Sequence, residues 1–266
     1  MSKKLFVVFA IITLTLSLFG CDSAKNPSTQ NDAQNNISSQ TYIIKTKTLS
    51  EKITDDENSE IYEISCTYPI ISSTANADVI KKINSEFETD AKNFISETKN
   101  SENVANAKAM SKKVKAQNQE FYPHSSTVTY ILKYNKNNIL SFLKAREDYT
   151  GGTSYVYNSV GKTYNMQNGN NLKIEDVLEP TNLGLIKILS SGFKKEIQEN
   201  QGVFKNAPQL TEDTLTNNMK KLNWYLSDEG IVFFFNPNTI IPNVNEILKF
   251  TYAYNGNKNM FKIQIQ

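Results

Sequence analysis

The chain has 266 residues, of which 39% are hydrophobic and 21% are charged, and these proportions are ordinary for a folded globular protein. Its formal net charge is +2, and Lys3 and Lys4 at the N-terminus account for the whole excess of basic residues. Because binding of nucleic acid needs a basic patch or stripe, the composition excludes nucleic acid as a partner.

The first 21 residues are typical of an export signal. Lys3 and Lys4 precede an uncharged and largely apolar run, Leu5–Phe19, which is shorter than the ~20 residues that a membrane-spanning helix needs. Residues 18–21, Leu-Phe-Gly-Cys, resemble the lipobox of bacterial lipoproteins, in which the cysteine sulfur takes a diacylglyceryl group. The resemblance implies that Cys21 is the site of lipid attachment. The alternative is a plain secretory signal with an incidental cysteine.

These features predict a lipoprotein signal peptide over residues 1–20 and a flexible tether over residues 21–50. The tether is rich in Asn, Ser and Gln, and such a segment cannot bury enough apolar surface to offset its ordering entropy. We therefore expect a protein that is lipid-anchored on the extracytoplasmic face of the bacterial cytoplasmic membrane. Its contact with the membrane is expected through the anchor only.

The second cysteine, Cys66, lies in an alternating pattern of apolar and polar residues between Tyr62 and Ile70, which is typical of a strand. The alternation directs Cys66 inward, so we expect a buried and unreactive thiol. If Cys21 is acylated, no intramolecular disulfide can form.

Strand patterns start near Tyr42 and again at Ile61–Ile71, and a helix capped by Thr74 or Asn76 is expected after them. The apolar residues of this helix recur at intervals of three and four: Ile80, Ile83, Phe87, Ala91 and Phe94. A second helix, with a thin apolar stripe, is expected over residues 102–118.

From Thr127 the apolar pattern has a period of two, and four residues are expected on one face of a strand: Val128, Tyr130, Leu132 and Tyr134. The polar run 135–138 should then turn the chain into a hairpin. The segments expected next are, in order, a strand over residues 139–145, a break at Gly151-Gly152, a strand over residues 155–166 and a helix over residues 185–197.

The last third of the chain repeats short strands and turns. The expected elements are a short helix over residues 211–221, a hairpin of residues 223–226 and 231–235 whose second strand is buried on both faces, and strands over residues 248–254 and 261–265. Because strands outnumber helices and adjoin through tight turns, the predicted fold class is α+β, with largely antiparallel sheets and helices packed on one side. Two consecutive subdomains are expected, over residues 51–150 and 151–266.

Catalytic chemistry has little support in the sequence. His124 is the sole histidine, so no second imidazole is available for a zinc site. It follows Tyr122-Pro123 at an expected strand entry, and we expect a loop histidine without a special role. The spacing Ser-x-x-Lys occurs three times, as chance gives in a chain rich in both residues, and the partner motifs of penicillin-binding enzymes are absent. Adjacent carboxylates such as Asp55 and Asp56 are expected in solvated loops. The sequence therefore indicates no enzyme, no cofactor and no metal site.

Tyrosines are a better indication of function, since they supply rigid contact area with a polar tip. Four of them gather in sequence around Gly151 and Gly152: Tyr149, Tyr155, Tyr157 and Tyr164. Two interpretations stay open at this point. These side chains pack in the core, or they form a binding surface.

Several short motifs carry a resemblance to a known family. They are residues 148–153 (Asp-Tyr-Thr-Gly-Gly-Thr), 164–166 (Tyr-Asn-Met) with the turn Asn168-Gly169, 172–178 and 224–235 (Trp-Tyr-Leu-Ser-Asp-Glu-Gly-Ile-Val-Phe-Phe-Phe). Over residues 50–255 the chain resembles a bacterial extracytoplasmic module with two halves, usually described as domains of unknown function. The module is known from the ectodomain of lysozyme-sensing anti-sigma factors (RsiV-like) and from the non-catalytic N-terminal part of peptidoglycan deacetylases (PdaC-like).

The chain departs from this family in two respects. Thr153 and Ser154 stand where the family commonly has Ala-His, so any role of that imidazole is lost. The proline-containing loop that follows the last hairpin in the family is represented only loosely here, by residues 236–244. In addition, the sequence shows neither the cytoplasmic segment with a transmembrane helix nor the deacetylase domain of those proteins. We therefore expect neither an anti-sigma factor of that architecture nor a deacetylase.

The resemblance implies a non-catalytic, membrane-anchored binding protein. Its expected ligand is a lysozyme-like protein first and cell-wall glycan second. The ligand-binding residues are expected in the loops around residues 151–157 and 236–245, because loops expose adaptable contacts on a rigid frame; they are Tyr149, Gly151, Gly152, Tyr155, Tyr157, Asn238 and Pro242. The alternatives are a peptidoglycan-binding or peptidoglycan-modifying accessory protein, and a structural partner of another envelope protein.

Overall fold

The computed structural model describes residues 42–73, 76–153, 155–179, 182–204, 207 and 210–263. These residues belong to one compact unit, residues 37–266. The predicted signal peptide, Cys21 and the predicted tether up to residue 41 lie outside the described residues. The elements are, in chain order, β1 Ile43–Thr54, β2 Glu60–Ser72, α1 Ala77–Lys99, α2 Glu102–Ala116, β3 His124–Lys136, β4 Ile139–Tyr149, β5 Tyr155–Asn165, β6 Asn170–Asn171, α3 Ile174–Val177, α4 Asn182–Glu199, α5 Gln201–Phe204, α6 Glu212–Asn218, η1 Met219–Lys221, β7 Asn223–Leu226, β8 Gly230–Phe235, β9 Leu248–Ala253 and η2 Lys258–Met260.

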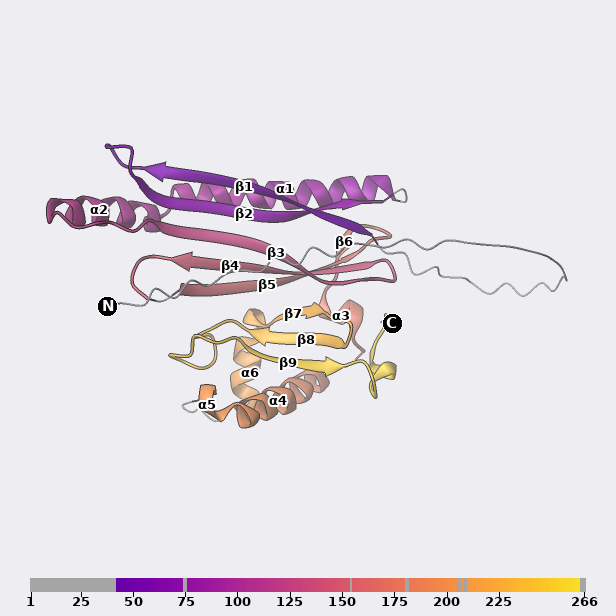
Figure 1. Cartoon of the computed structure of the whole chain (residues 1–266). Coiled ribbons are helices and arrows are strands. Elements are labelled where there is room, and N and C mark those ends of the chain that lie inside the picture. Colours follow the sequence, from indigo (N-terminus) through magenta and orange to yellow (C-terminus); the bar gives the residue numbers. More distant parts are fainter. Residues whose placement is uncertain are drawn as a thin grey trace, which may run out of the picture. The chain divides into compact units, whose positions relative to one another are not determined.

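The fold class is α+β, as predicted, and the strands form two sheets (Figure 1). Six strands follow each other in sequence order from β1 to β6, and three more form the sheet β7-β8-β9. Every neighbouring pair is antiparallel except β2 and β3. A parallel pair needs a long crossover connection, and α1 and α2 provide it.

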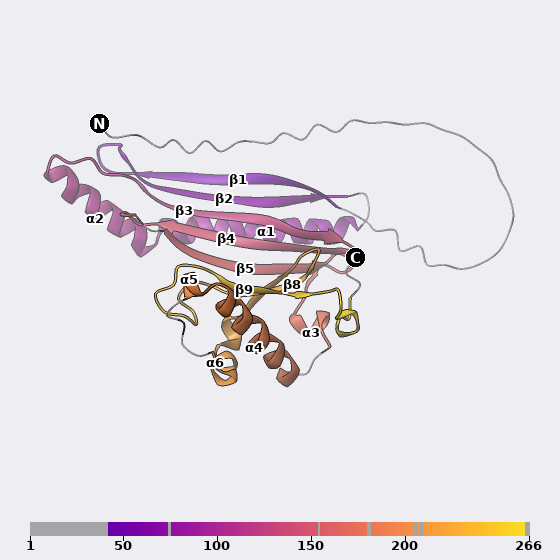
Figure 2. The ribbon, with the colours of Figure 1, turned by 60° about the horizontal axis from the view of Figure 1, so that its bottom comes forward.

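One face of the six-stranded sheet is covered by α1 and α2 (Figure 2). The residues of α1 predicted from their spacing are those it buries: Ile80, Ile83, Phe87, Ala91 and Phe94. The Phe87 ring lies edge-on to the rings of Tyr130, Phe142 and Tyr164, with centroids 5.1, 5.3 and 5.4 Å away. This face of the sheet therefore carries the first hydrophobic core.

Cys66 lies in this core, as predicted, and 1% of it is exposed. Burial disfavours the charged thiolate and raises the pKa of the thiol to about 11. Because the thiolate is the reactive form, Cys66 is a packing residue here.

Asn76 is the N-cap residue of α1, at one of the two predicted positions, but its side chain does not cap the helix. Its backbone is left-handed, with φ of 55°, and its Nδ2 donates a hydrogen bond to the Met166 carbonyl oxygen at 3.0 Å. Thr74, the other predicted cap, lies outside the described residues. Asn76 therefore ties the start of α1 to the end of β5.

The prediction that Tyr134 shares a face with Val128 and Tyr130 is wrong. The register of β3 against β4 shifts between Leu132 and Tyr134, which marks a bulge at Lys133. One extra residue reverses the alternation of a strand. Tyr134 is consequently buried in the second core, on the opposite face, and Leu132 is 40% exposed.

The second core lies between the three-stranded sheet and α4. Phe193 of α4 packs on Phe235 and Phe250, with ring centroids 5.1 and 4.7 Å away. Gly192 permits this approach, because a Cβ there would lie 2.3 Å from the Phe250 ring. All six residues of β8 are buried, as predicted for a strand covered on both faces.

Strand β7 lies against β4 and β5 of the larger sheet. A Cβ on Gly161 of β5 would be 1.6 Å from the Trp224 carbonyl oxygen, so only glycine permits this contact. The Leu226 N–H of β7 donates to the Ser141 hydroxyl of β4 at 2.9 Å. Residue 150, the predicted limit between subdomains, lies between β4 and β5, which pair over their whole length. The division into two subdomains stays a prediction.

Strand β1 confirms the strand pattern expected near Tyr42, and it includes residues 43–50 of the predicted tether, because Ile44, Leu49 and Ile53 pack against the first core. At the other end, the described part of the strand expected over residues 261–265 is not a strand: Phe261 makes a single bridge to Leu178.

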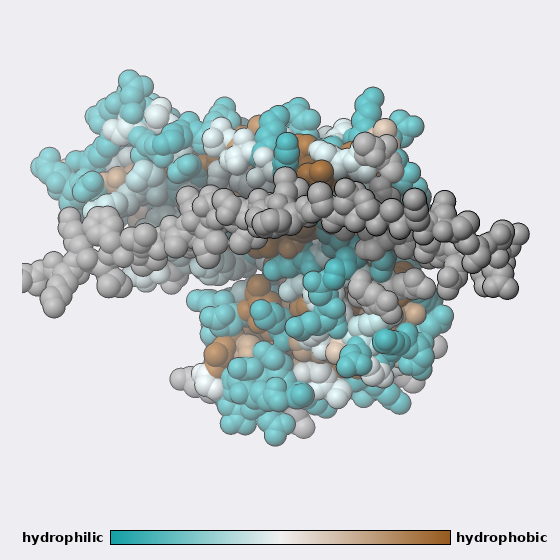
Figure 3. All heavy atoms as spheres, turned by 45° about the vertical axis from the view of Figure 1, so that its right-hand side comes forward, coloured by the Kyte–Doolittle hydropathy of each residue, from teal (hydrophilic) through white to brown (hydrophobic). Residues whose placement is uncertain are grey.

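In the space-filling view the visible surface is mostly hydrophilic, with hydrophobic residues in separate small patches (Figure 3).

Candidate functional site

A row of three tyrosine rings lies at one end of the six-stranded sheet. Tyr149 ends β4 and is opposite Tyr155, the first residue of β5. The ring centroids of Tyr149 and Tyr155 are 5.1 Å apart, and those of Tyr155 and Tyr157 are 6.3 Å apart. Tyr155 and Tyr157 are each 41% exposed. The structure thus brings together three of the four tyrosines that the sequence singled out; we call Tyr149, Tyr155 and Tyr157 the tyrosine row.

Tyr164, the fourth tyrosine, belongs to the first core. It is fully buried, and its hydroxyl donates a hydrogen bond to a Glu86 carboxylate oxygen at 2.8 Å. Burial raises the pKa of this hydroxyl, so it stays a donor. The core interpretation therefore holds for Tyr164, and a binding surface formed by the exposed tyrosines stays a prediction.

Gly151 and Gly152 form the turn that brings Tyr155 back beside Tyr149. Their φ angles of 95° and 83° are ones that side chains with a Cβ rarely adopt. A Cβ on Gly151 would lie 3.0 Å from Nε2 of His124, whereas a Cβ on Gly152 would meet nothing within 4 Å. The Tyr149 hydroxyl donates to the Gly152 carbonyl oxygen at 3.2 Å. These glycines, predicted as ligand contacts, shape the turn, and Gly151 covers His124.

His124 lies at a strand entry, as predicted, but it is a buried strand residue and not the expected loop histidine. It begins β3, pairs with Tyr62 of β2, and is 3% exposed. Its ring lies among those of Tyr62, Phe121 and Tyr149, with centroids 6.3, 5.3 and 6.0 Å away. Burial lowers its pKa, and its Nδ1 has no hydrogen-bond partner among the described residues. His124 is buried because it packs among these aromatic rings. The neighbouring residues Tyr122 and Pro123 gave no indication of this burial.

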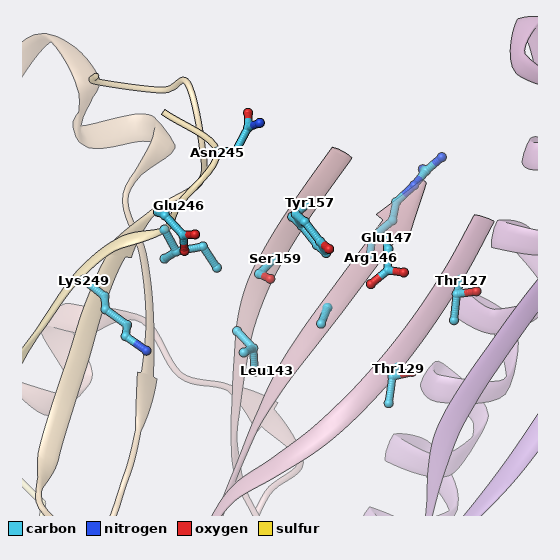
Figure 4. Close-up of a pocket in the computed structure, with 12 residues that line it drawn as sticks. Thr127, Thr129, Leu143, Arg146, Glu147, Tyr157, Ser159, Asn245, Glu246 and Lys249 are labelled. Carbon is cyan, nitrogen blue, oxygen red and sulfur yellow. The ribbon is translucent and has the colours of Figure 1, made fainter. Parts of the chain in front are cut away.

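A cavity of about 600 Å³ opens beside the tyrosine row, on the sheet face that α1 and α2 leave uncovered (Figure 4). Three neighbouring strands and the segment leading into β9 line it: Thr127 and Thr129 from β3, Leu143, Ala145, Arg146 and Glu147 from β4, Tyr157 and Ser159 from β5, and Asn245, Glu246, Ile247 and Lys249. Alternation along β4 puts Leu143, Ala145 and Glu147 on this face, opposite Phe142 in the core.

Two carboxylates flank Tyr157 in the cavity, Glu147 from β4 and Glu246 from the segment before β9. Desolvation is the largest cause of the raised pKa of the Tyr157 hydroxyl, and the negative charges of Glu147 and Glu246 raise this pKa further. Among the described residues neither carboxylate forms an ion pair or a hydrogen bond. Both are exposed, so they can meet a cation from outside the chain.

The cations that border the cavity do not neutralise these acids. The Arg146 guanidinium bonds Asp148 at 2.8 and 3.0 Å and lies 5.3 Å from the centre of the Phe94 ring, which belongs to the helix-covered side. Lys249 borders the cavity from the opposite wall, in β9 (Figure 4). It acts electrostatically on Lys133, whose pKa is lowered by burial and by this neighbouring charge.

The loop after β8 contributes differently from its prediction. Asn238 takes a left-handed conformation, φ 59°, and its N–H donates to the Val244 carbonyl oxygen at 3.2 Å. Asn238 and Pro242 are exposed, and neither is among the residues lining the cavity. The contribution of this loop comes from its end, at Asn245 and Glu246. A binding role for Asn238 and Pro242 stays a prediction.

Sequence reasoning missed the two carboxylates and the hydroxyl groups beside them. Glu147 directly precedes the Asp148-Tyr149 motif, and the alternation of β4 indicated that Glu147 shares a face with Ala145. The sequence gave no signal for Glu246, because the place of Glu246 in the cavity depends on how the two sheets pack.

Comparison with known proteins gives partial matches. Residues 55–153, less than half of the chain, match the family model described as Deacetylase PdaC. The matched segment runs from the loop after β1 to the turn before β5. No match is found among curated proteins. The predicted resemblance to a PdaC-like module is therefore confirmed for this segment; the RsiV-like part and the lipoprotein stay predictions.

Two crystal structures share the fold over most of the chain. A member of the DUF3298 family from Bacteroides fragilis superposes with a TM-score of 0.58 and 14% identity, covering 84% of this chain and 94% of that one. A DUF3298 family protein from Pseudomonas aeruginosa gives a TM-score of 0.51 and 10% identity, covering 84% of this chain and 95% of that one. At these identities the likeness establishes the fold alone.

No helix among the described residues is both long and apolar enough to cross a membrane. Within the same residues, no three His, Cys, Asp or Glu side chains are grouped so that they could hold a metal ion.

Proposed function

We propose that the chain is a non-catalytic binding protein, lipid-anchored through Cys21 on the extracytoplasmic face of the bacterial cytoplasmic membrane, whose ligand is a lysozyme-like protein. The observation that carries the proposal is the tyrosine row, because two of its rings are open to solvent on the rim of a cavity. Tyrosine is enriched at protein interfaces, where its ring gives contact area at low entropic cost.

The lipid anchor is tested by incorporation of labelled palmitate. We expect the unaltered chain to incorporate it and the Cys21→Ser variant not to.

Rigid support of the row favours a binding role. Strands β4 and β5 pair over eleven residues, from Ile139 with Asn165 to Tyr149 with Tyr155, and they end in the turn at Gly151 and Gly152. A surface whose side chains are already held in place loses little entropy on binding, and this raises affinity.

The test is retention of lysozyme by the full chain, purified in mild detergent and immobilised. The double substitution Tyr155→Ala and Tyr157→Ala should weaken retention by at least tenfold, since truncation of interface tyrosines costs about 2 kcal/mol or more. Tyr122→Ala is the matched control, because Tyr122 is 67% exposed and lies outside the row. No retention of lysozyme at micromolar concentration would discard this ligand.

Cell-wall glycan is a second candidate, which the hydroxyl groups of the cavity favour. Thr127, Thr129 and Ser159 line it beside the Tyr157 ring, and the Thr127 hydroxyl also accepts a hydrogen bond from Ser65 at 3.3 Å. An aromatic ring next to several hydroxyls suits a sugar. Sedimentation with insoluble peptidoglycan, compared with lysozyme retention in the same buffer, separates the two ligands.

An enzyme acting on peptidoglycan is the competing class. Glu147 and Glu246 are the two carboxylates in the cavity that such an enzyme could use, but both are exposed to solvent. The description of the matched family makes acetate release from cell walls the activity to measure. We expect none above buffer, and turnover abolished by Glu147→Gln would reject the non-catalytic proposal.

A further inference from the structure

The outer edge of β5 is open over the first part of the strand. Only Tyr164 and Asn165, near its end, pair with β6. The first four residues of β5 are all exposed, and the fifth, Ser159, is buried. Within the described chain, no strand pairs with residues 155–163 on the side away from β4.

Asn236 occupies one position of this open edge. Its Oδ1 accepts a hydrogen bond from the Ser159 N–H at 2.7 Å, and its Nδ2 donates to the Ser159 carbonyl oxygen at 2.9 Å. A side-chain amide carries the same donor and acceptor as a peptide group, so Asn236 stands where a residue of a neighbouring strand would pair. The backbone groups of Ser159 therefore point away from β4.

The pairing of Ser159 fixes the direction of the next positions. Backbone groups of residues two apart in a strand point to the same side. The Thr163 carbonyl oxygen obeys this rule, since it accepts the Leu172 N–H at 2.7 Å on the same outer side. The N–H and C=O groups of Tyr157 and Tyr155 consequently point outward as well, next to the position that Asn236 fills.

This edge lacks the usual protection against strand pairing. Natural sheets protect edge strands with charges, prolines or bulges, whereas residues 155–161 contain no charged residue and no proline. Tyr155, Val156 and Tyr157 are 41%, 62% and 41% exposed. Three consecutive exposed apolar residues beside free backbone groups suit addition of an extended segment.

The charge of the cavity indicates what that segment carries. Side chains of Tyr155, Tyr157 and Ser159 lie on the cavity face, so an added strand would direct alternate side chains over the same face. There they would meet the Glu147 and Glu246 carboxylates, which have no cationic partner among the described residues. A lysine or arginine side chain supplies the missing charge.

We propose that the edge of β5 at Tyr155–Tyr157 binds an extended segment of a partner protein as an added β-strand, with a lysine or arginine of that segment between Glu147 and Glu246. The inference rests on the proposed function only in taking the ligand to be a protein. Two other occupants fit less well. Residues 22–41 of this chain carry two acids and one lysine, and a second copy pairing through its own β5 brings an uncharged edge.

The backbone part of the proposal is tested by Tyr157→Pro against Tyr157→Val in the full chain. Both substitutions remove the tyrosine ring, but only proline also removes the backbone N–H of residue 157. Because this N–H points away from β4, its removal breaks no hydrogen bond within the sheet. The ligand is a fluorescein-labelled peptide of alternating valine and arginine, measured by fluorescence anisotropy. Binding should be about fivefold weaker in the proline variant than in the valine variant, since one hydrogen bond is lost. Equal binding by the two variants overturns strand addition.

The charge part is tested with a peptide in which glutamate replaces arginine. The arginine peptide should bind more tightly, and Glu147→Gln or Glu246→Gln should weaken it about threefold, as expected for a pair near the surface. Equal binding of both peptides rejects the basic side chain.

Two further measurements keep the proposal open to refutation if a variant folds poorly. Hydrogen exchange of the unaltered chain should slow over residues 155–158 when the arginine peptide is added, and no slowing contradicts it. Sedimentation that shows a dimer, lost in Tyr157→Pro, would assign the edge to a second copy and overturn the proposal. If the proline and valine variants retain lysozyme equally, strand addition is rejected and the proposed lysozyme-like ligand is not. If the arginine peptide binds but lysozyme is not retained, only the lysozyme-like ligand is rejected.

Discussion

On the helix-covered face of the six-stranded sheet, the Tyr130 and Tyr164 hydroxyls that meet an acid are buried. On the open face, Tyr155 and Tyr157 are exposed, and the acids beside Tyr157 form no ion pair among the described residues. The Tyr130 hydroxyl donates to Asp90, whose carboxylate also accepts from Lys144 at 2.7 Å. Across the sheet, Glu147 and Glu246 stand beside Tyr157 without an ion pair among the described residues.

The difference shows how the same residue types serve stability on one face and binding on the other. A buried polar group costs free energy unless it is hydrogen-bonded, and on the covered face the Tyr130 and Tyr164 hydroxyls donate to acids, whereas the Tyr68 hydroxyl has no partner among the described residues. On the open face water satisfies the polar groups, and these groups stay available to a ligand. The comparison can be tested by substitutions on each face and at the contact between the sheets.

The largest effect is expected for Phe87→Ala on the covered face. Phe87 is fully buried and lies edge-on to three aromatic rings, so its truncation leaves a cavity and should lower the free energy of unfolding by about 3–5 kcal/mol. Urea denaturation followed by circular dichroism measures it. Tyr157→Ala is the control on the open face, with an expected change within about 0.5 kcal/mol. Similar losses in both variants would remove the distinction between the faces.

A smaller loss is expected for Gly161→Ala, at the contact between the two sheets. The added Cβ would meet the Trp224 carbonyl oxygen at 1.6 Å, and the backbone has to move apart, at a cost of about 1–3 kcal/mol. Gly202→Ala is the matched control, because a Cβ there meets nothing within 4 Å. Thermal unfolding of both variants checks this, and an unchanged melting temperature in Gly161→Ala would mean that β7 does not pack on β5 as described.

The smallest effect is expected at Asp55, in the loop that joins β1 to β2. Its carboxylate accepts hydrogen bonds from Lys115 at 2.5 Å and from the Ser59 and Glu57 N–H groups at 3.0 Å each. The Lys115 bond, the largest cause, lowers the pKa of Asp55 from 3.8 to about 2. The stabilisation is present above pH 4 and is lost as pH falls towards 2, because the unfolded chain takes up the proton first.

The measurement for Asp55 is the melting temperature between pH 5 and pH 2. The Asp55→Asn variant should start lower at pH 5 and fall less steeply than the unaltered chain. Asp56→Asn is the control, since Asp56 is 71% exposed and its two lysine contacts are longer, 3.5 and 3.6 Å. Parallel curves for the unaltered chain and Asp55→Asn would contradict the assigned role.

Much of the fold could be predicted because it depends on local periodicity. The spacing of Ile80, Ile83 and Phe87 gave α1 and its buried face, and alternation gave the inward direction of Cys66. Periodicity failed at Tyr134, where a one-residue bulge reversed the face, and in the described part of the last expected strand, where Phe261 makes a single bridge to Leu178. Neither event changes the pattern of residue types, so the sequence held no signal of it.

The candidate site divides in the same way. Tyr149, Tyr155 and Tyr157 could be singled out from the sequence, because they lie close together along the chain around two glycines. Glu246 and Asn236 could not, since they are more than 75 residues away and reach β5 only through the packing of β7 on the larger sheet.

By itself, the sequence determined the α+β class, the helix-covered core and the place of the tyrosines, because the period of apolar residues decides which face of each element leaves water. Only the tertiary structure decided which tyrosines stay exposed, which carboxylates stand beside them, and that Asn236 fills one position of an otherwise open strand edge. These depend on contacts between segments far apart in the chain, whose geometry is set by close packing of two sheets and not by any local pattern.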